Sequence, residues 1–424
     1  MFLIKGGTVY SSSGKKHLDI RIHDDRIVEM GHDLDVDGEQ VIDATGLLVL
    51  PGAIDPHVHF RDPGNPEKED FRSGTEAAVA GGVTYIMDMP NTNPPVIDME
   101  SLNQKREIAK QKAVSNFGLY VGATPDNIED LAELCSQPNV VGVKVYMGSS
   151  TGNLLVDKAE YWDKIFQIPG IQVVVHAECE ECILENMRKF ETIEDPEIHS
   201  VIRGNDVAET ATRQALEIGM KYGTRLNIAH MSTAEELFAV REYKDKGYDN
   251  LSCEVCPHHL IFNTDDYHEK GMFLRVNPPI RSKEDRRSLW EDGINLGVVD
   301  MLATDHAPHT VEQKDKPYKQ AASGMPGVQE LTPLMLEAIH RGDLTLERFV
   351  ELRCFGPARI FRLKDRGDLK EGYFADIVLI DFDQKWTITA SEMKSKCGWT
   401  NYEGFKVRGK VVKTFVNGRL VFEN

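Results

Sequence analysis

Long apolar runs and an excess of basic residues are both missing from this sequence of 424 residues. No apolar stretch approaches the ~18 to 20 residues that a membrane-spanning helix needs, which argues against a transmembrane protein. Lys and Arg number 49 against 68 Asp and Glu, so the formal net charge is −19. Nucleic acids and anionic membranes repel such a chain and are not expected as partners. A small anionic substrate remains compatible, because a few cations can determine the potential inside a pocket.

Cysteine is scarce, with 7 residues scattered along the chain. An odd number so spread does not indicate a disulfide framework. Two CxxC pairs occur, Cys179/Cys182 and Cys253/Cys256, and together they raise the question of a zinc-thiolate site. The segment around Cys253 has the pattern of a strand, in which residues three apart point to opposite faces. Ordinary core thiols are therefore the preferred interpretation. Residues 1–5 also lack the layout of a signal peptide, and a cytoplasmic location is predicted.

Short strands are predicted near both ends of the sequence. Apolar β-like pieces alternate with Gly, Ser and Asp turns over the first fifty residues, and the last sixty look alike. Asn417-Gly418 is typical of a tight hairpin turn between two of these strands. We predict that residues 1–50 and 365–424 build one small β-sandwich domain that is discontinuous in sequence. Residues 51–364 are then a separate domain.

Between the two ends, short apolar strands alternate with longer helical stretches such as 128–134 and 207–222. This alternation is the pattern of βα units around a parallel sheet. Eight strands are expected, the number that closes a (β/α)8 TIM-type barrel, so the fold class is α/β. They are predicted at 53–55, 85–88, 118–121, 141–145, 171–175, 226–229, 251–255 and 299–303.

The polar residues that stand out follow the carboxyl ends of these strands, where barrel enzymes form their active sites. His57 and His59 lie two apart in an extended segment, so both imidazoles can face one cation. His176, His230 and Asp305 follow three other strands. Imidazole nitrogen and carboxylate oxygen are ligands that zinc accepts, and two ions ~3.5–4 Å apart can hold a hydroxide between them.

Lys144 lies within an apolar strand, where a buried ammonium would be unfavourable. One interpretation is a side chain whose tip reaches solvent. The other places it at the barrel mouth with the histidines. A lysine carboxylated by carbon dioxide would there become an anionic oxygen ligand that bridges two metal ions.

These residues carry a resemblance to the dihydroorotase family of the amidohydrolase superfamily, over nearly the whole sequence. The matching segments are 55–64 (DPHVHFRDPG), 89–94 (MPNTNP), the Lys144 strand, His176, His230, 276–279 (VNPP) and 303–309 (ATDHAPH). The resemblance implies that His57, His59 and Asp305 hold one zinc ion, that His176 and His230 hold the other, and that carboxylated Lys144 bridges them. Many bacterial members have aspartate at the bridging position, so the lysine favours a two-metal site here.

The resemblance also implies reversible hydrolysis of dihydroorotate to N-carbamoyl-L-aspartate in pyrimidine synthesis. Asp305, beside the metals, is suited to take a proton and deliver it to the departing ring nitrogen. Arg61 lies two residues beyond His59, and its guanidinium can hold a carboxylate through two parallel hydrogen bonds. In the family this arginine binds the substrate carboxylate together with Asn91 and His309, while Asn277 contacts the ring amide region.

Two other functions are compatible with the pattern. Allantoinases and dihydropyrimidinases (hydantoinases) share the metal ligands but act on rings without the carboxylate. A non-catalytic scaffold is less favoured, because all six expected ligand positions are filled. The family commonly forms homodimers, sometimes assembled with aspartate transcarbamoylase. We expect supporting roles for His258, His259 and His306, and a lid or substrate contact from 310–327, where Gly324 or Gly327 would let backbone approach a ligand.

Overall fold

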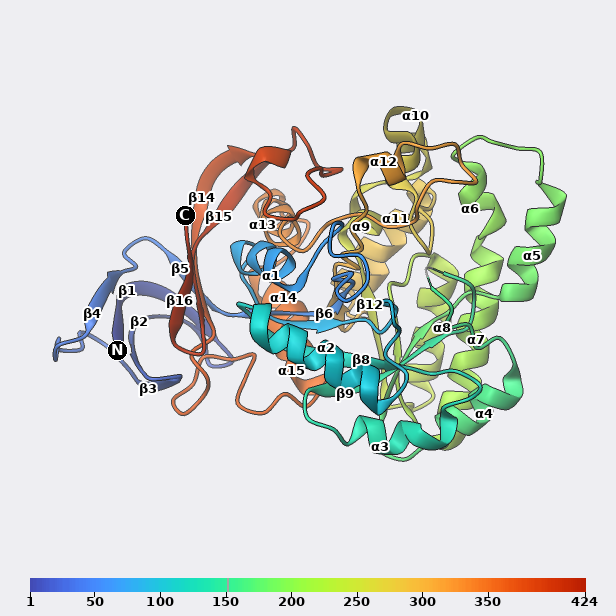
Figure 1. Cartoon of the computed structure of the whole chain (residues 1–424). Helices are drawn as coiled ribbons and strands as arrows, with labels where there is room; N and C mark the ends of the chain where they lie inside the picture. Colours follow the sequence, from blue (N-terminus) through green and yellow to red (C-terminus); the bar gives the residue numbers. More distant parts are fainter. Residues whose placement is uncertain (151) are drawn as a thin grey trace.

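The computed structural model describes residues 1–150 and 152–424, in which two sheets lie side by side (Figure 1). The larger part is built on eight parallel strands in the order β6 to β13, each paired with its neighbours in the sequence. All eight predicted strands are present, and the predicted α/β barrel is confirmed. The strands are β6 (Ala53–Val58), β7 (Val83–Asp88), β8 (Asn116–Gly122), β9 (Val140–Tyr146), β10 (Gln172–His176), β11 (Arg225–Ile228), β12 (Leu251–Val255) and β13 (Met301–Leu302).

The first and last strands of the barrel meet through a few specific contacts rather than a regular ladder. The backbone N–H of Thr304 donates to Asp55 Oδ1 at 3.1 Å, and the N–H of His59 donates to the carbonyl of His306 at 2.8 Å. A single parallel bridge pairs Val58 with His306. The segment after β6 therefore lies beside the segment after β13, although nearly 250 residues separate them in the sequence.

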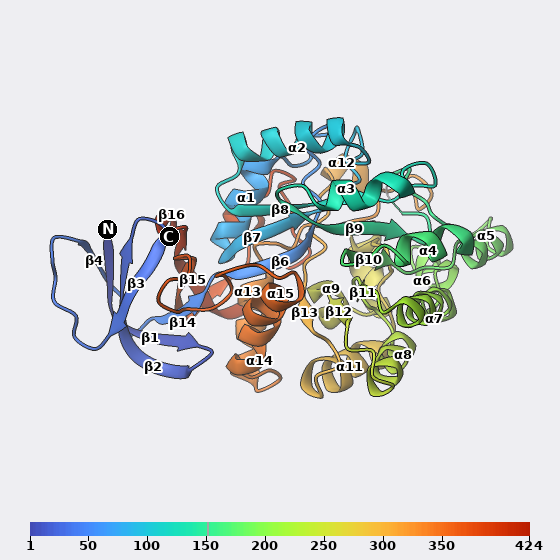
Figure 2. The same ribbon diagram turned by 90° about the horizontal axis from the view of Figure 1, so that it is seen from below.

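Helices cover the outside of the barrel (Figure 2). The predicted helix at 207–222 is α7, whose alanines face inward and which ends at Gly223 in a left-handed conformation with φ of 63°. Helix α8 begins at a capping box between Thr233 and Glu236. The α-helices are α1 (Phe71–Ala80), α2 (Met99–Lys112), α3 (Leu131–Cys135), α4 (Ala159–Phe166), α5 (Glu180–Lys189), α6 (Ile198–Ile202), α7 (Asn205–Tyr222), α8 (Ala234–Asp245), α9 (Pro257–Ile261), α10 (Tyr267–Lys270), α11 (Lys283–Ser288), α12 (Val311–Lys314), α13 (Leu331–Arg341), α14 (Leu346–Val350) and α15 (Gly356–Ile360).

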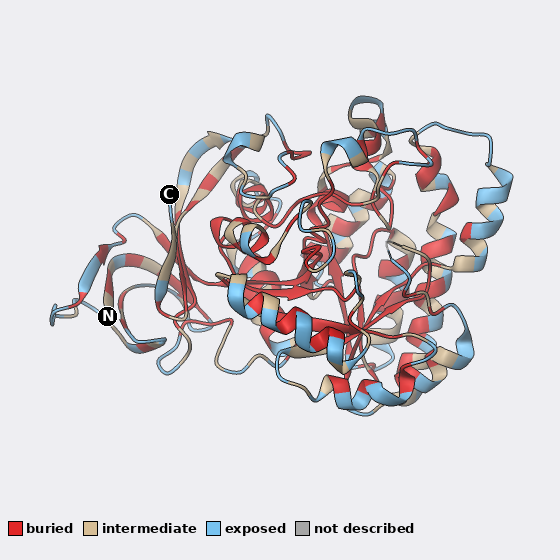
Figure 3. Cartoon of the chain, in the orientation of Figure 1, coloured by how far each residue is buried: buried red, intermediate tan, exposed pale blue. Residues whose placement is uncertain are grey.

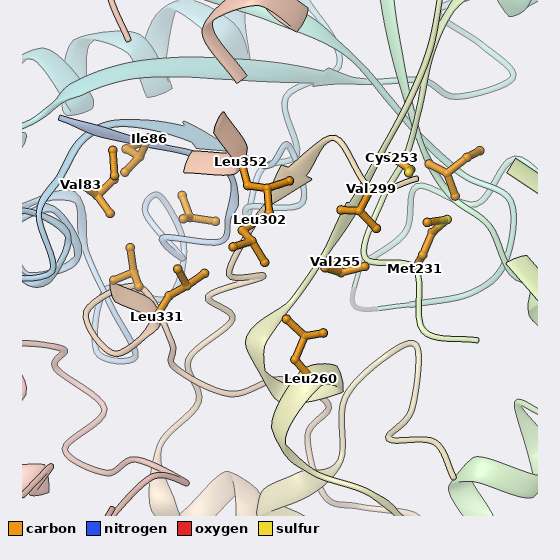
Figure 4. Packing of buried hydrophobic residues seen from close by; sticks show 14 of the residues in the cluster. Val83, Ile86, Met231, Cys253, Val255, Leu260, Val299, Leu302, Leu331 and Leu352 are labelled. Carbon is orange, nitrogen blue, oxygen red and sulfur yellow. The ribbon is translucent and has the colours of Figure 1, made fainter. Parts of the chain in front are cut away.

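The barrel is filled by side chains and is not a pore. Its interior cluster includes Ile54, Met87, Tyr120 and Val174, and the buried hydroxyl of Tyr120 donates to the carbonyl of Pro56 at 2.9 Å. Burial is concentrated in the strands and in the inward faces of the helices (Figure 3). Figure 4 shows part of the large hydrophobic cluster, in which side chains of β7 and β12 lie among others from distant segments, such as Leu331 of α13. The mouth of the barrel is therefore the part of its interior where polar groups gather.

The smaller sheet combines strands from both ends of the sequence. Its order is β16-β15-β14-β5-β1-β2-β3, with β4 paired to β1, and β14 pairs antiparallel with β5. The predicted hairpin turn is present, with φ of 47° at Asn417 and 71° at Gly418, as a two-residue hairpin requires. The strands are β1 (Phe2–Ser11), β2 (Gly14–His23), β3 (Arg26–Gly31), β4 (Gln40–Asp43), β5 (Leu48–Pro51), β14 (Ile377–Thr387), β15 (Lys406–Val416) and β16 (Arg419–Glu423).

The two CxxC pairs differ in oxidation state. Cys253 and Cys256 are buried free thiols, as predicted. Cys179 and Cys182 form a disulfide, so the prediction of core thiols is wrong for this pair. The physical reason is local: Cys179 is the N-cap of α5, and the first helical turn brings Cys182 to a Cα–Cα distance of 5.3 Å. No helix in residues 1–150 or 152–424 is long and apolar enough to span a bilayer.

A buried ion pair ties α2 to the end of β7. Lys105 Nζ lies 2.6 Å from Asp88 Oδ2, and neither side chain is exposed. Lys105 also donates to the carbonyl of Met89 at 2.6 Å, and Asp88 accepts the N–H of Phe60 at 2.7 Å. The pair therefore fixes the backbone after β6 and after β7, from which candidate site residues extend.

We expect Lys105→Met to lower the free energy of unfolding by about 3 to 5 kcal/mol, because it leaves the Asp88 carboxylate buried without its partner. Urea titration followed by circular dichroism measures the change. The double variant with Asp88→Asn removes the orphaned charge and should recover part of the loss, since the amide oxygen can still accept from Phe60. A single variant that unfolds within about 1 kcal/mol of wild type would contradict this role of the pair.

Candidate active site

The six predicted metal ligands all lie at the carboxyl ends of barrel strands, and each is at most 9 % exposed. Five of the strands supply a side chain within the strand or within three residues after it. The positions are His57 in β6 and His59 just after it, Lys144 in β9, His176 at the end of β10, His230 after β11 and Asp305 after β13. The barrel thus brings together residues from across about 250 positions of sequence, as the sequence predicts.

His57, His59 and Asp305 form one compact cluster. One ligand atom from each lies within 4.8 Å of the others, and in the described part of the chain this is the only such group of His, Cys, Asp or Glu side chains. Asp305 Oδ1 is 3.4 Å from His57 Nε2 and 3.0 Å from His59 Nε2. The donor set, two imidazoles and a carboxylate, is one that binds zinc.

His176 and His230 form a second group beside the first. His176 Nδ1 lies 3.0 Å from His230 Nε2, and the ring of His230 is 5.1 Å from that of His57. Lys144 is fully buried in the same cavity lining, and its Nζ has no hydrogen-bond partner. A buried amine with no partner is costly, so its position favours a ligand or a chemical modification there.

Two of these residues have strained backbones. His230 has φ of 37° and Asp305 has φ of 47°, a left-handed conformation that residues other than glycine rarely adopt. Such strain persists where the surrounding structure imposes it, and it is concentrated at functional sites. Here both residues follow directly on buried strands at the barrel mouth.

Burial controls the protonation of the cluster. It lowers the pKa of His57, His59, His176 and His230, which keeps the imidazoles neutral and their lone pairs available. Burial also opposes ionisation of Asp305, but His57 and His59 outweigh this effect and bring the pKa of its carboxyl to about 2. Neutral imidazoles around an ionised carboxylate fit a divalent cation.

Two buried glutamates that the sequence analysis missed contact the histidines. His57 Nδ1 lies 2.5 Å from Glu254 Oε1, and His176 Nε2 lies 2.7 Å from Glu178 Oε2. Glu178 is also paired with the guanidinium of Arg203. Carboxylates beside ligating histidines orient the rings and fix their tautomers. The signal in the sequence was an acidic residue within the apolar strand β12, and another two positions beyond His176.

Three of the four predicted substrate-binding residues line the same cavity. Arg61 is 5 % exposed; its Nε donates to the carbonyl of Pro308 at 3.2 Å, and its Nη2 lies 3.2 Å from His309 Nε2. Asn91 Oδ1 is 2.7 Å from His59 Nδ1, and Asn277 Oδ1 is 2.9 Å from His199 Nε2. The cavity lining includes Arg61, Asn91 and Asn277 with all six predicted ligands, while His309 contacts Arg61 without being part of the lining.

The loop after β13 also closes on this cavity. Gly324, with φ of 137°, lines it, and a Cβ there would lie 2.4 Å from the carbonyl of Ala307. Gly327 is not part of the cavity lining, and its N–H donates to His306 Nδ1 at 3.0 Å. The buried ammonium of Lys314 holds the loop in place by donating to three carbonyls, those of residues 275, 322 and 324, at 2.8 to 2.9 Å.

Three other histidines of the mouth lie outside the cavity lining. His306 faces Glu69 through Nε2, at 3.4 Å, in addition to its contact with Gly327. His259 donates from Nε2 to the carbonyl of Pro278 at 3.1 Å, and His258 is buried beside it. These contacts support the segments around the site.

Comparison with known proteins places this barrel in a family. The sequence matches the Amidohydrolase family over residues 48–421, which is most of the chain. The chain belongs to the amidohydrolase family. This amidohydrolase is 36 % identical to the dihydroorotase of Methanosarcina mazei, with 95 % of this chain and 90 % of the relative covered. It is 38 % identical to the dihydroorotase of Pyrococcus abyssi, with 89 % and 84 % covered.

Among solved structures, the amidohydrolase is similar to the L-hydantoinase (dihydropyrimidinase) of Arthrobacter aurescens. The TM-score is 0.95 at 30 % identity, with 100 % of this chain and 96 % of that chain covered. The resemblance inferred from the motifs is confirmed. The two relatives found by sequence are dihydroorotases, whereas the similar solved structure is a hydantoinase. The choice between their substrates therefore rests on the residues of the site.

Proposed function

We propose that this amidohydrolase is a dihydroorotase, which opens the ring of (S)-dihydroorotate to N-carbamoyl-L-aspartate and closes it again in pyrimidine synthesis. The observation that carries the proposal is the buried guanidinium of Arg61 beside the metal-ligand cluster. Dihydroorotate has a ring carboxylate, whereas hydantoin and dihydropyrimidine rings have none. Burial removes water from the guanidinium, and a substrate carboxylate facing it would offset this loss with charge-assisted hydrogen bonds.

We propose that the cluster of ligands holds two zinc ions. His57, His59 and Asp305 would hold one, His176 and His230 the other, and Lys144 would bridge them after carboxylation. Burial lowers the pKa of Lys144, which favours the free amine that reacts with carbon dioxide. When bound, the metal polarises the amide carbonyl and lowers the pKa of a water molecule.

The remaining work belongs to the side chains of the chain itself. Arg61, with Asn91 and His309, binds the substrate carboxylate and fixes the position of the ring. Asn277 contacts the amide region of the ring. Asp305, ionised at neutral pH, accepts a proton from the water molecule that attacks the amide. It then delivers this proton to the departing ring nitrogen.

A hydantoinase or dihydropyrimidinase is the second candidate, favoured by the structural similarity to the Arthrobacter aurescens enzyme. The same experiment tests the third possibility, an allantoinase. The experiment follows ring opening by ultraviolet absorbance with dihydroorotate, hydantoin, dihydrouracil and allantoin in parallel. We expect turnover of dihydroorotate alone. Turnover of an uncharged ring without turnover of dihydroorotate would refute the proposal, and so would a protein that binds metal but opens none of these rings.

Lys144 should control the metal content of the protein. We expect about two zinc ions per chain in the wild type and at most one in Lys144→Met, because the bridging ligand is lost. Activity should fall at least a hundredfold. Elemental analysis after gel filtration measures the metal, and chelation followed by addition of zinc should remove and restore wild-type activity.

Lys105→Met is the matched control for this experiment, since it replaces another fully buried lysine that is not a proposed ligand. It should lose stability but keep the metal content of the wild type. Full zinc occupancy in Lys144→Met would contradict the bridging role.

Assembly, location and domain boundaries are also proposals. We propose a cytoplasmic homodimer that can associate with aspartate transcarbamoylase, and a small domain made of residues 1–50 and 365–424 beside a catalytic domain of 51–364. Light scattering, which measures the molecular mass of the protein alone and mixed with the transcarbamoylase, tests both proposals about assembly. Limited proteolysis tests the domain boundaries.

A further inference from the structure

A segment that belongs to the small sheet reaches the barrel mouth. Residues 395–402, here called the strap, lie between β14 and β15, where the chain leaves the sheet and extends toward the barrel (Figure 1). Its second half is buried, and Trp399 is 7 % exposed. None of the proposed ligands or substrate-binding residues lies in this segment.

The strap is bonded to the loop that follows β13. The indole Nε1–H of Trp399 donates to the backbone carbonyl of His309 at 2.7 Å. The indole ring also packs edge-to-face on Phe273, with ring centroids 5.0 Å apart. Trp399 is therefore held by packing on one side, and its polar N–H is directed at the segment that carries His309.

Two further contacts place the strap against other segments of the mouth. Asn401 Nδ2 donates to the carbonyl of Phe273 at 2.8 Å, four residues before Asn277. The backbone N–H of Lys396 donates to Glu69 at 3.2 Å, and Glu69 faces His306. The strap thus contacts the backbone that leads to Asn277 as well as the loop after β13.

Arg61 depends on the same loop. Its Nε donates to the carbonyl of Pro308, and its Nη2 lies beside His309 Nε2. A shift of the backbone at residues 308–309 would therefore move both the guanidinium of Arg61 and the imidazole of His309, the two groups proposed to bind the carboxylate. In residues 1–150 and 152–424, no hydrogen bond or ring contact joins Trp399 to the metal-ligand cluster, so the geometry of the cluster can persist when the indole N–H is removed.

We propose that Trp399 is a positioning residue, which sets the Arg61–His309 pair through the carbonyl of His309 and thereby determines affinity for the substrate's ring carboxylate. The inference rests on the proposed function, because it assigns this pair to a carboxylate. It makes the small sheet part of substrate selection, although every group that touches substrate lies in the barrel.

The test compares Trp399→Phe with the wild type. Phenylalanine keeps an aromatic ring in the packing and removes the N–H donor together with the second ring of the indole. The control variant described next makes the same reduction in volume. We expect KM for dihydroorotate to rise about tenfold, because a displaced His309 backbone weakens about one hydrogen bond between the Arg61–His309 pair and the substrate carboxylate. The value of kcat should stay within about twofold. The inhibition constant of orotate, which carries the carboxylate, should weaken by the same factor. Zinc content should not change.

Trp386→Phe is the matched control. Trp386 also donates its Nε1–H to a backbone carbonyl, that of Gly409 at 3.0 Å, but it lies in the small sheet away from the mouth. This variant should leave KM, kcat and orotate inhibition unchanged. The unfolding midpoint of both variants is measured by circular dichroism, so that a general loss of stability is recognised.

Each outcome has a distinct meaning. A wild type without dihydroorotate turnover refutes the proposed function before Trp399 is considered. An active wild type whose Trp399→Phe variant behaves as Trp386→Phe does overturns the positioning role. Equal losses in kcat and in orotate binding, together with a lower zinc content, would also overturn it, because they indicate general disruption of the mouth.

Discussion

Arg61→Met is expected to lower kcat/KM for dihydroorotate by about a thousandfold. The guanidinium offers two charge-assisted hydrogen bonds to the ring carboxylate, which together contribute about 4 kcal/mol. Methionine has a similar length and fills the buried position without a charge. Steady-state kinetics by ultraviolet absorbance measure the effect, and most of it should be in KM because the metal ligands are unchanged.

Arg61→Lys separates charge from geometry. Lysine keeps the positive charge but lacks the planar pair of donors, so an intermediate loss is expected. Any residual turnover of hydantoin or dihydrouracil should be equal in the wild type and in Arg61→Met. A similar loss on all substrates would show that Arg61 supports the fold of the mouth rather than recognition of the carboxylate.

Asp305→Asn should reduce kcat by about a thousandfold or more. The amide has nearly the shape of the carboxylate, but it cannot accept the proton and is a weaker metal ligand. Asp305 Oδ1 lies 3.0 Å from His59 Nε2, so the substitution also removes the anion beside this imidazole. Single-turnover kinetics and zinc analysis are measured on the same preparation to distinguish loss of chemistry from loss of metal.

Asp315→Asn is the control for this variant. Asp315 is exposed in the loop after β13, and its substitution removes one negative charge near the mouth without contact to the cluster. Its kcat should equal that of the wild type. An Asp305→Asn protein with full zinc content and a kcat within about tenfold of wild type would remove Asp305 from the proton transfer.

The barrel was predictable because its strands are short apolar segments separated by amphipathic helices. All eight strands were located from this alternation, but the last was expected at 299–303, whereas β13 covers only Met301–Leu302. The difference arises because Asp55 and the bridge to His306 close the barrel in place of a longer ladder. Strands β3 and β4 were not identified, since their exposed residues interrupt the apolar pattern.

The positions of the candidate site residues were predictable where a residue lies at or just beyond the carboxyl end of a strand, as His57 and Asp305 do. It was not predictable where a residue acts through contacts between distant segments. Glu254 is recognised only when the barrel places it beside His57, and Trp399 only when the strap reaches His309. The disulfide between Cys179 and Cys182 depends on where α5 begins, which the spacing of the two cysteines does not show.

The pairing of β5 with β14 has a consequence for synthesis of the chain on the ribosome. Strands β1 to β5 are made first, so β5 can pair with β1, but its other neighbour, β14, emerges only after the barrel strands have been translated. Until then β5 presents an open edge of apolar strand, which other nascent chains can pair with. The small sheet can therefore be completed only after β14 has been translated, and the free edge of β5 stays exposed until then.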